Sequence, residues 1–318
     1  MKAAIHLRYG PPEVVSISDV PSPTLQDGEF LVRVHASTVN RTDCGFRSAV
    51  YVISRLFSGL FKPRRNILGC EYAGEVTDVQ GVKTVKPGDR VFGYNDTRFG
   101  GHAEYMVVNA NDAFALIPES MSFIDAAPLT EGSHYALCDL RAAHVGEGTS
   151  VLIYGATGAI GSAAVQLARV MGAKVTAVCG AAHLDLVRSL GADRVIDFTS
   201  SEFARLRETF DVVFDAVGKL SWSRCKPLLT DRGCYISTEL GPRYENPFLA
   251  LLTPLLGGKR VLFPIPTITA RDVEYLRSLA IKGSYRPLID RVMSLDEIVD
   301  AYRYVETGQK IGNVVISV

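Results

Sequence analysis

The chain has 318 residues, and its 34 Lys and Arg residues balance its 34 Asp and Glu residues. A neutral chain lacks the positive charge with which proteins bind nucleic acids or anionic membrane surfaces, so we expect neither partner. Hydrophobic residues make up 47% of the chain and charged residues 21%, which is typical of a folded globular protein and excludes a disordered one. The length predicts about two domains, each with its own core.

The N-terminal segment alternates like a strand and turns at Gly10–Pro12. It has neither a long apolar region nor a small-residue cleavage site, so we predict no signal peptide. The six cysteines are scattered and form no CxxC pair. Scattered cysteines without a secretion signal indicate reduced thiols and a cytoplasmic location.

One apolar segment, 247–266, needs to be tested as a membrane span. Lys259 and Arg260 interrupt it, and several Pro and Gly residues break it. A spanning helix needs about 20 consecutive apolar residues. We therefore expect a buried helix followed by a core strand, and no membrane span.

The first hundred residues consist of short alternating runs separated by Gly and Pro turns. A helical or irregular stretch, 43–65, interrupts them. Strands at this spacing are typical of a compact β domain. The expected strands are 30–37, 74–79, 85–94 (entered through the turn Pro87–Asp89) and 103–109.

The pattern changes near residue 120, where helical segments begin to alternate with strands. Such alternation predicts βαβ units and a parallel sheet. The helices are expected at 121–145, 158–171 and 184–190, and the strands at 150–154, 174–179, 193–198, 211–218 and 233–238. From about residue 270 we expect two helices, 271–283 and 294–308, a short strand near 286–289, and a final strand at 313–318.

The strongest chemical signal is the segment 151–168, where a buried strand runs into a glycine-rich turn and then into an apolar-faced helix. Gly155 and Gly158 allow a sharp turn and a close approach to a pyrophosphate, while Gly161 lets the helix pack on the strand. The helix N-terminus offers N–H groups and the positive end of its dipole to phosphates. We predict a dinucleotide site of the form GAxGxxG at Gly155, Ala156, Thr157, Gly158, Ala159, Ile160 and Gly161.

The residues after the next strand favour NADP(H) over NAD. An Asp or Glu there would bind the ribose 2′-hydroxyl and disfavour a 2′-phosphate. The chain has no acid in this stretch, where we expect Cys179, Gly180 and His183 to bind the cofactor. His183 and Arg188 are the candidate partners of the phosphate, although His183 could equally be a solvated residue at the start of a helix.

The motifs, in this order along the whole chain, resemble the medium-chain dehydrogenase/reductase superfamily. GCEYAGEV at 69–76 and VKPGDRVFG at 85–93 precede the glycine turn, and GADRVIDF at 191–198, DVVFDAVG at 211–218 and a C-terminal GNVVISV follow it. Within the superfamily the chain is similar to the zinc-free quinone oxidoreductase branch.

The resemblance implies an α/β fold of two domains. One is a GroES-like β-rich catalytic domain built from both ends of the chain, 1–120 and 269–318. The other is a Rossmann doubly wound parallel sheet, 121–268. The resemblance also implies a cofactor bound in the cleft and a homodimer formed through the Rossmann edge strand near 261–265.

The same resemblance addresses the metal. Zinc-dependent relatives place a Cys where this chain has Asn40, and a His where it has Cys70, before Glu71. The four-cysteine lobe for a structural zinc is missing, because no cysteine lies between Cys70 and Cys138. A catalytic zinc needs about three protein ligands and an open position. Cys70, Glu71 and Cys44 would form a degraded set, so we expect no metal.

The expected lack of a zinc site limits the substrates that the protein could reduce. Oxidation of a plain alcohol would lose its usual means of stabilising an alkoxide without a Lewis acid. A quinone or an α,β-unsaturated carbonyl accepts hydride at carbon and spreads negative charge onto its oxygen, where hydrogen-bond donors can stabilise it. The resemblance therefore implies a zinc-independent, NADPH-dependent reductase of quinones or activated alkenes. Two alternatives stay open: a carbonyl reductase of the same fold, and a non-catalytic NADPH-binding protein.

The candidate catalytic residues implied by the resemblance are Asn40, Tyr94, Thr130 and Tyr135. Asn40 stands where the family approaches the substrate, although Asn is also a common turn residue after a strand. Thr130 and Tyr135 lie in the helix entry beside the nicotinamide, and Tyr135, in place of a Thr often found in relatives, is either a donor to the substrate or a packed aromatic. Tyr94 and Tyr51 lie in stretches that line the cleft in relatives.

Further cofactor contacts are expected at the carboxyl ends of the later strands, where parallel sheets bind ligands. The residues concerned are Val217 and Gly218 near the adenosine, Thr238 near the central part of the cofactor, and Phe263 and Pro264 near the nicotinamide. Asn313 stands where relatives frequently carry Lys or Asn and is expected to reach the cofactor.

Overall fold

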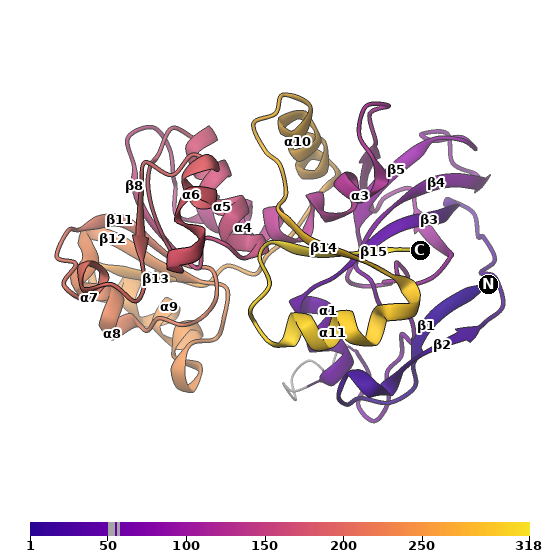
Figure 1. The fold of residues 1–318 in the computed structure, drawn as a ribbon, viewed down its shortest axis with the longest axis horizontal. Helices are drawn as coiled ribbons and strands as arrows, with labels where there is room; N and C mark the ends of the chain where they lie inside the picture. Colours follow the sequence, from indigo (N-terminus) through magenta and orange to yellow (C-terminus); the bar gives the residue numbers. More distant parts are fainter. Residues whose placement is uncertain (50–54, 56–57) are drawn as a thin grey trace. The chain divides into compact units, whose positions relative to one another are not determined.

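The structure is a computed structural model that describes residues 1–49, 55 and 58–318. The chain divides into two compact units. The first contains Met1–Glu131, Ile268–Lys282 and Pro287–Val318, and the second contains Gly132–Thr267 and Gly283–Arg286. Both chain termini therefore belong to the first unit (Figure 1). Tyr51, a candidate proton donor, lies outside the described residues.

A mostly antiparallel sheet forms the centre of the first unit. Its strands run in the order β14-β15-β3-β4-β5-β7, and β6 pairs with β3. Only β14 and β15 pair in parallel among the described strands of this sheet. The strands are β3 (Glu29–Val39), β4 (Glu71–Gln80), β5 (Arg90–Tyr94), β6 (Tyr105–Asn109), β7 (Ala113–Leu116), β14 (Ile289–Ser294) and β15 (Asn313–Ser317), with a separate pair β1 (Lys2–His6) and β2 (Val15–Asp19).

The helices of the first unit come from three parts of the chain. They are α1 (Arg41–Ser48), α3 (Phe123–Ala126), α10 (Ala270–Ile281) and α11 (Ile298–Glu306), with 3-10 turns at Pro12–Val14, Ala127–Leu129 and Leu295–Glu297. Helix α11 buries Ile298, Ala301, Tyr302 and Val305, whose spacing places them on one face. The buried Arg47 of α1 forms an ion pair with Glu306 of α11, so charge as well as packing joins the two helices.

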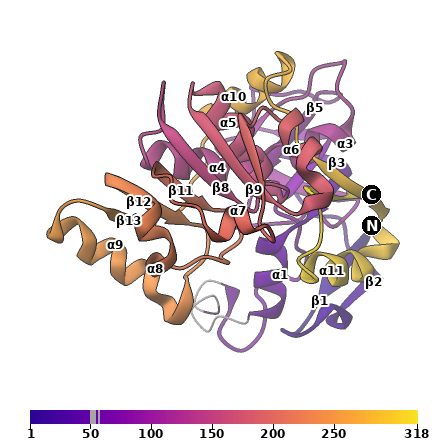
Figure 2. The same cartoon turned by 60° about the vertical axis from the view of Figure 1, so that its left-hand side comes forward.

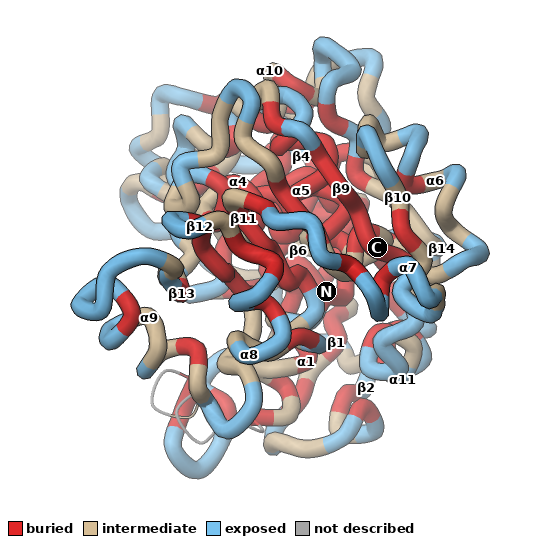
Figure 3. The backbone as a smooth tube through the Cα atoms, turned by 90° about the vertical axis from the view of Figure 1, so that its left-hand side faces the viewer, coloured by how far each residue is buried: buried red, intermediate tan, exposed pale blue. Residues whose placement is uncertain are grey.

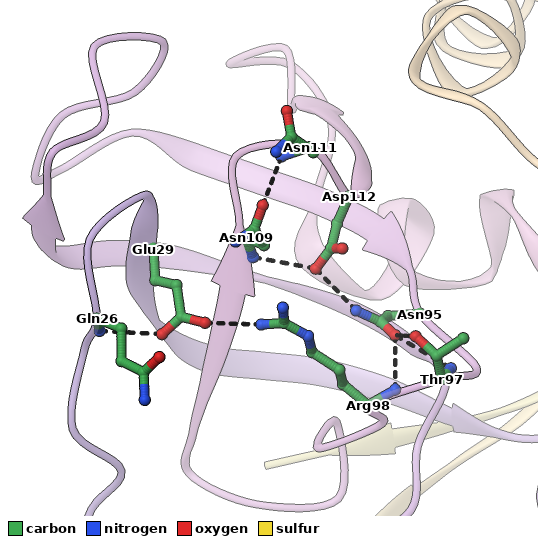
Figure 4. A network of polar contacts seen from close by, with 8 residues as sticks. All are labelled: Gln26, Glu29, Asn95, Thr97, Arg98, Asn109, Asn111 and Asp112. Atoms are coloured by element: carbon green, nitrogen blue, oxygen red, sulfur yellow. Dashed lines mark hydrogen bonds and ion pairs between the residues drawn. The ribbon is translucent and has the colours of Figure 1, made fainter.

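The loop after Tyr94 is held by a network of polar side chains (Figure 4). Asn95 donates to Asp112 over 2.8 Å, and the backbone N–H of Asn109 donates to the same carboxylate over 3.0 Å. Arg98 pairs with Glu29 at 2.8 Å. These contacts tie the loop to β3 and to the turn between β6 and β7, and so fix the end of β5.

The second unit is built on a parallel sheet. Its described strands run in the order β10-β9-β8-β11-β12-β13, which is the doubly wound order with a reversal between β8 and β11. The inner strands β9, β11 and β12 are largely buried (Figure 3). The strands are β8 (Ser150–Tyr154), β9 (Lys174–Cys179), β10 (Arg194–Asp197), β11 (Phe210–Asp215), β12 (Leu229–Ser237) and β13 (Arg260–Leu262).

Helices connect these strands. They are α4 (Glu131–Ala142), α5 (Ala159–Val170), α6 (Leu184–Ser189), α7 (Ser201–Ala204), α8 (Trp222–Cys225) and α9 (Glu245–Leu256), with 3-10 turns at Ala181–His183, Lys226–Leu228 and Pro242–Tyr244. From Ala159 to Ala168, helix α5 consists mostly of small or apolar residues, and most of them are buried. The α/β fold class predicted from the sequence, with a GroES-like domain and a Rossmann sheet, is confirmed.

The prediction that 247–266 forms a buried helix is wrong. Helix α9 lies beside β13 at the edge of the sheet (Figure 2), and Val261 N–H donates to Thr253 over 2.9 Å. Only one face of α9 packs inward, through Asn246, Leu249 and Thr253. The other face exposes more than half of each of five large side chains, namely Phe248, Leu251, Leu252, Leu255 and Leu256.

Three other boundaries differ for local reasons. The strand expected near 286–289 lies at Ile289–Ser294, because Pro287 has no N–H to donate to a ladder. The strand expected from residue 85 begins at Arg90, after the turn. The helical segment 121–145 is interrupted where Pro128 leaves helical geometry, with a ψ of 16°. Strands β2 and β7 are additions that the sequence pattern did not predict.

Candidate functional site

The glycine turn connects β8 to α5. Gly155 has a φ of +82°, a conformation that favours glycine. A Cβ on Gly161 would lie 2.1 Å from the carbonyl oxygen of Gly155, whereas a Cβ on Gly158 would come no closer than 3.6 Å to a described atom. Gly161 is therefore required for the helix to start against the strand, and Gly158 leaves an open face.

The start of α5 has the features of a phosphate cradle. Gly158 is its N-cap, and no side chain in the described part of the chain caps it. No acidic residue stands in the first turn. Uncapped N–H groups at the positive end of a helix dipole bind phosphate, and the open face at Gly158 lets a pyrophosphate approach the backbone. The turn thus fits a dinucleotide.

The neighbouring strand end keeps the turn in place. The N–H groups of Gly155 and Ala156 both donate to the carbonyl of Val178, over 3.0 and 3.1 Å. Val217 lies against Gly155, where a Cβ would come within 2.6 Å of a Val217 methyl carbon. The predicted segments at the ends of β8, β9 and β11 are therefore together in the structure.

The stretch after β9 contains Cys179, Gly180 and the turn Ala181–His183. Arg188, the second candidate partner of a 2′-phosphate, is ion-paired with Asp185 at 2.6 Å. Both side chains of this pair are more than half exposed, so the ion pair is weak and a phosphate could replace it. Arg188 therefore remains a candidate partner of the phosphate, as does His183 in the turn Ala181–His183.

A cavity of about 200 Å³ lies at the ends of β12 and β13. Four predicted residues line it together: Tyr135 from α4, Thr238 after β12, and Phe263 and Pro264 after β13. The remaining walls come from Asp139, Ser237 and the stretch up to Pro266. The structure thus brings three residues predicted for the nicotinamide end, Tyr135, Phe263 and Pro264, into one cavity with Thr238, which was predicted near the central part of the cofactor.

The first unit holds a buried polar cluster around Glu71. One carboxylate oxygen accepts three hydrogen bonds, from the N–H and hydroxyl of Thr130 over 3.0 and 2.8 Å and from the N–H of Glu131 over 2.6 Å. The other accepts from the hydroxyl of Thr38 over 2.6 Å. Burial raises the pKa of Glu71, and these donors oppose the rise. Glu71 therefore binds the N-terminal end of α4.

Asn40 is committed on both sides of its amide. Its Oδ1 accepts from the N–H of Asp43 over 3.0 Å and so caps α1. Its Nδ2 donates to Sγ of Cys70 over 3.0 Å. Burial raises the pKa of the Cys70 thiol well above its usual range. The resemblance implies that zinc-dependent relatives have zinc ligands at these two positions. In this chain the two side chains form a hydrogen bond with each other.

Two further buried carboxyl groups and a lysine complete the cluster. Burial raises the pKa of Asp43 to about 8, and burial together with the charge of Glu71 raises the pKa of Glu131 to about 7. Asp43 accepts from the N–H of Gly69 over 3.0 Å, and Glu131 accepts from Thr42 over 3.2 Å. Burial lowers the pKa of Lys310, and charge interactions with Glu131 and Glu71 oppose this shift.

Three of the four candidate catalytic residues, Asn40, Tyr94 and Thr130, lie in the first unit, and Tyr135 lies in the second. Tyr94 packs in the core cluster with Val39 and Cys70. Asn313, a predicted cofactor residue, belongs to the first unit, where its Nδ2 donates to the carbonyl of Leu288 over 2.9 Å. The structure therefore gives Asn313 a role in anchoring β15.

Sequence reasoning missed Asp139 and Glu131. Asp139 stands between Leu137 and Leu140 in a helix and is 2% exposed. A carboxyl group among buried apolar neighbours at helical spacing is the signal that could have found it. Glu131 gives no such signal, because the residue that donates to its side chain, Thr42, is 89 positions away in the chain.

Known protein families match two parts of this chain. Residues 26–119 match the family described as alcohol dehydrogenase GroES-like domain, and residues 190–316 match the family described as zinc-binding dehydrogenase. The chain is 32% identical to 2-methylene-furan-3-one reductase of Solanum lycopersicum over 99% of its own length and 79% of that protein. The chain belongs to the medium-chain dehydrogenase/reductase superfamily, in its quinone oxidoreductase-like branch.

Two other members of the superfamily support this placement. An NADPH-dependent alkenal/one oxidoreductase, chloroplastic, of Arabidopsis thaliana is 30% identical over 99% of this chain and 79% of that protein. The quinone oxidoreductase from Coxiella burnetii has the same fold, with a TM-score of 0.88 and 28% identity over 100% of this chain and 99% of that one. The chain is thus an oxidoreductase of an NAD(P)-dependent superfamily.

The zinc named in one family description does not fit the donor atoms found here. Asn40 and Cys70 are hydrogen-bonded to each other, and both oxygens of Glu71 accept hydrogen bonds from Thr38, Thr130 and Glu131. A catalytic zinc requires thiolate, imidazole or carboxylate atoms that converge on one point. Within residues 1–49, 55 and 58–318, no group of three or more His, Cys, Asp and Glu side chains is arranged to hold a metal.

None of the described helices combines the length and the apolar composition needed to cross a bilayer.

Proposed function

We propose that this chain is a zinc-independent, NADPH-dependent reductase of quinones or α,β-unsaturated carbonyls. The observation that carries the proposal is the hydrogen bond from Asn40 to Cys70. The bond joins an amide donor to a buried thiol, at the two positions where the resemblance implies zinc ligands in zinc-dependent relatives. Without a Lewis acid, acceptors that delocalise the new negative charge are the substrates that the protein can reduce.

The proposed cofactor is NADPH. Residues 179–183 contain no carboxylate that would repel a 2′-phosphate. His183 ends this stretch, and Arg188 follows in α6. The name of the Arabidopsis relative includes NADPH. When bound, the cofactor supplies a hydride. The residues of the turn 155–161 hold its pyrophosphate through the uncapped N–H groups of α5.

Among the candidate catalytic residues, we assign the hydroxyl donor to Tyr135. Its side chain lines the cavity at the ends of β12 and β13, whereas the hydroxyl of Thr130 donates to Glu71. A phenol next to the acceptor would donate a hydrogen bond to the oxygen that gains negative charge. Asn40, Thr130 and Tyr94 then have structural roles in the first unit. Asn40 caps α1, Thr130 donates to Glu71, and Tyr94 packs in the core.

We further propose a homodimer formed by the second unit. Strand β13 is the last strand of the parallel sheet among the described residues. Next to it, α9 exposes Leu251, Leu255 and Leu256 by more than 70% each. An open strand edge beside an apolar helix face is the kind of surface that a second copy covers. The cytoplasmic location stays a prediction, and several relatives are named as chloroplastic.

The proposed function is tested by substrate panels. Purified protein with NADPH is offered quinones, enones and alkenals in one panel and simple aldehydes and ketones in another, each with and without a chelator. We expect turnover in the first panel only, unchanged by the chelator. Turnover restricted to the second panel would favour the carbonyl reductase alternative, and NADPH binding without turnover in either would favour a non-catalytic protein.

A further inference from the structure

The cavity at the ends of β12 and β13 contains a side chain for which the proposed function has no role. Asp139 lies one helical turn after Tyr135 on α4, and both residues line the cavity. Every residue that lines this cavity belongs to the second unit. The cavity is therefore a property of the Rossmann sheet and α4 alone.

Asp139 is buried, and one of its carboxyl oxygens has no hydrogen-bond partner among the described atoms. The residue is 2% exposed, and the oxygen concerned is Oδ2. A buried polar atom without a partner costs about 1–3 kcal/mol, more if charged, and such atoms are rare in native proteins. An apolar residue would fill the same helix position at no such cost. The carboxyl group is therefore suited to a partner that the protein itself does not supply.

The surroundings of Asp139 favour the neutral form of its carboxyl group. No Lys, Arg or His is among the lining residues. Burial raises the pKa of Asp139 to about 8. A neutral carboxyl group offers one O–H donor and one carbonyl acceptor side by side. It complements a planar group that offers one acceptor and one N–H donor side by side, which is a primary carboxamide.

The rest of the cavity fits a flat ring that carries such a group. Phe263, Pro264 and Pro266 provide apolar surface, and neither proline has an N–H that would compete for the acceptor of the ligand. A volume of about 200 Å³ is below the range of roughly 300–1,000 Å³ that whole small ligands occupy. The cavity therefore takes one end of a longer ligand. Its place at the carboxyl ends of parallel strands is where such ligands bind.

We propose that Asp139 is a positioning residue that binds the carboxamide of the nicotinamide ring through a pair of hydrogen bonds. The inference rests on the proposed use of a nicotinamide cofactor. It assigns the carboxyl O–H to the amide carbonyl and the carboxyl C=O to the amide N–H. Such a pair would set the rotation of the ring and so decide which face points to the substrate.

The test compares NADPH with its reduced 3-acetylpyridine analogue, in which a methyl group replaces the amide NH₂. Dissociation constants are measured by fluorescence titration for the wild type, Asp139→Leu and Asp139→Asn. We expect the wild type to bind NADPH about tenfold more tightly than the analogue, which corresponds to one hydrogen bond. In Asp139→Leu the two dissociation constants should become about equal, because only the affinity for NADPH falls.

Asp139→Asn retains one donor and one acceptor, so it should keep most of the discrimination. Arg141→Ala, on the exposed part of the same helix, is the control and should bind both compounds like the wild type. Asp139→Leu should melt no lower than the wild type, because the carboxyl group it removes has no partner for its Oδ2. If the Leu variant does not fold, Asp139→Ala gives the same readout.

The outcomes separate the two proposals. An unchanged ratio in Asp139→Leu, or an equal loss of affinity for both compounds, overturns the role of Asp139. The same comparison is made with NADH and its acetylpyridine analogue. Tighter binding of NADH than NADPH overturns the proposed cofactor while the discrimination by Asp139 persists, and no binding of any of the four compounds overturns both proposals.

Discussion

Glu71 accepts a hydrogen bond from the backbone N–H of Glu131 over 2.6 Å. The same oxygen also accepts from the N–H of Thr130, so a buried carboxylate satisfies two free backbone donors at the start of α4. This arrangement makes one side chain responsible for the position at which the helix begins.

Replacement of Glu71 should therefore be costly. Glu71→Ala would leave the buried donors of Thr38, Thr130 and Glu131 without an acceptor, and we expect a loss of about 3 kcal/mol in the free energy of unfolding. Glu71→Gln keeps one carbonyl oxygen for Thr130 and Glu131 and should lose only about 1 kcal/mol. Urea titrations of both variants measure the difference. Equal stability of the Ala variant and the wild type would disprove this role.

The glycines of the cofactor turn should respond differently to Ala. In Gly161→Ala the new Cβ would meet the carbonyl oxygen of Gly155 at 2.1 Å, so the protein should melt at a lower temperature and lose NADPH binding. In Gly158→Ala the fold has room for the Cβ, but the open face that approaches the pyrophosphate is filled. We expect an unchanged melting temperature and a Kd for NADPH raised at least about tenfold.

Gly146→Ala serves as the control for this series, because no described atom lies within 4 Å of its Cβ position. For the three variants, calorimetry gives the melting temperature and fluorescence titration gives the Kd for NADPH. A Gly158→Ala variant that binds NADPH as tightly as the wild type would argue against the turn as the pyrophosphate site.

The exposed face of α9 should determine the oligomeric state. Leu251→Lys combined with Leu255→Lys places two charges on the face that we propose a second copy covers. We expect the wild type to sediment as a dimer and the double variant as a folded monomer. Ile281→Lys, at a residue of α10 that is 54% exposed, should leave the dimer intact. A monomeric wild type, or a double variant that stays dimeric, would contradict the proposed interface.

The pH dependence of stability should report on Asp139. Its pKa is about 8 in the folded protein, and an unfolded Asp titrates near about 4. Between these values the folded state holds a proton that the unfolded chain has released, so stability falls as pH rises. One such proton contributes a slope of up to about 1.4 kcal/mol per pH unit.

Asp139→Asn removes this contribution, so its advantage in stability over the wild type should grow from pH 5 to pH 8. Asp43 and Glu131, whose pKa values are also raised, stay in both proteins and do not affect the comparison. Urea titrations at several pH values measure the difference in the free energy of unfolding between the two proteins. Parallel stability curves for the two proteins would show that Asp139 is ionised in the folded state.

Local pattern was sufficient to predict the glycine turn after β8 and the parallel sheet. The spacing of Gly155, Gly158 and Gly161 after an apolar strand specifies both a turn and the helix that follows. Strands β12 and β13 run in parallel, so Thr238 and Phe263, which follow their ends, line the same cavity. These features depend on short-range geometry and on one general rule of parallel sheets.

The polar interior could not be predicted in this way. Glu71 and Thr130 are 59 residues apart, and only the folded chain brings them together. The exposed face of α9 was missed because apolar composition does not say which neighbour will cover a helix. Asp139 was missed because a single acid in a helix usually points to solvent.

Isotope transfer tests the central claim most directly. NADPH carrying deuterium on the reactive carbon is mixed with an enone and with enzyme treated with a chelator, and the product is examined by NMR. The account predicts one deuterium on the β-carbon of the saturated ketone, at the rate of untreated enzyme. Deuterium on the carbonyl carbon instead, or a reaction that stops until zinc is restored, would contradict it.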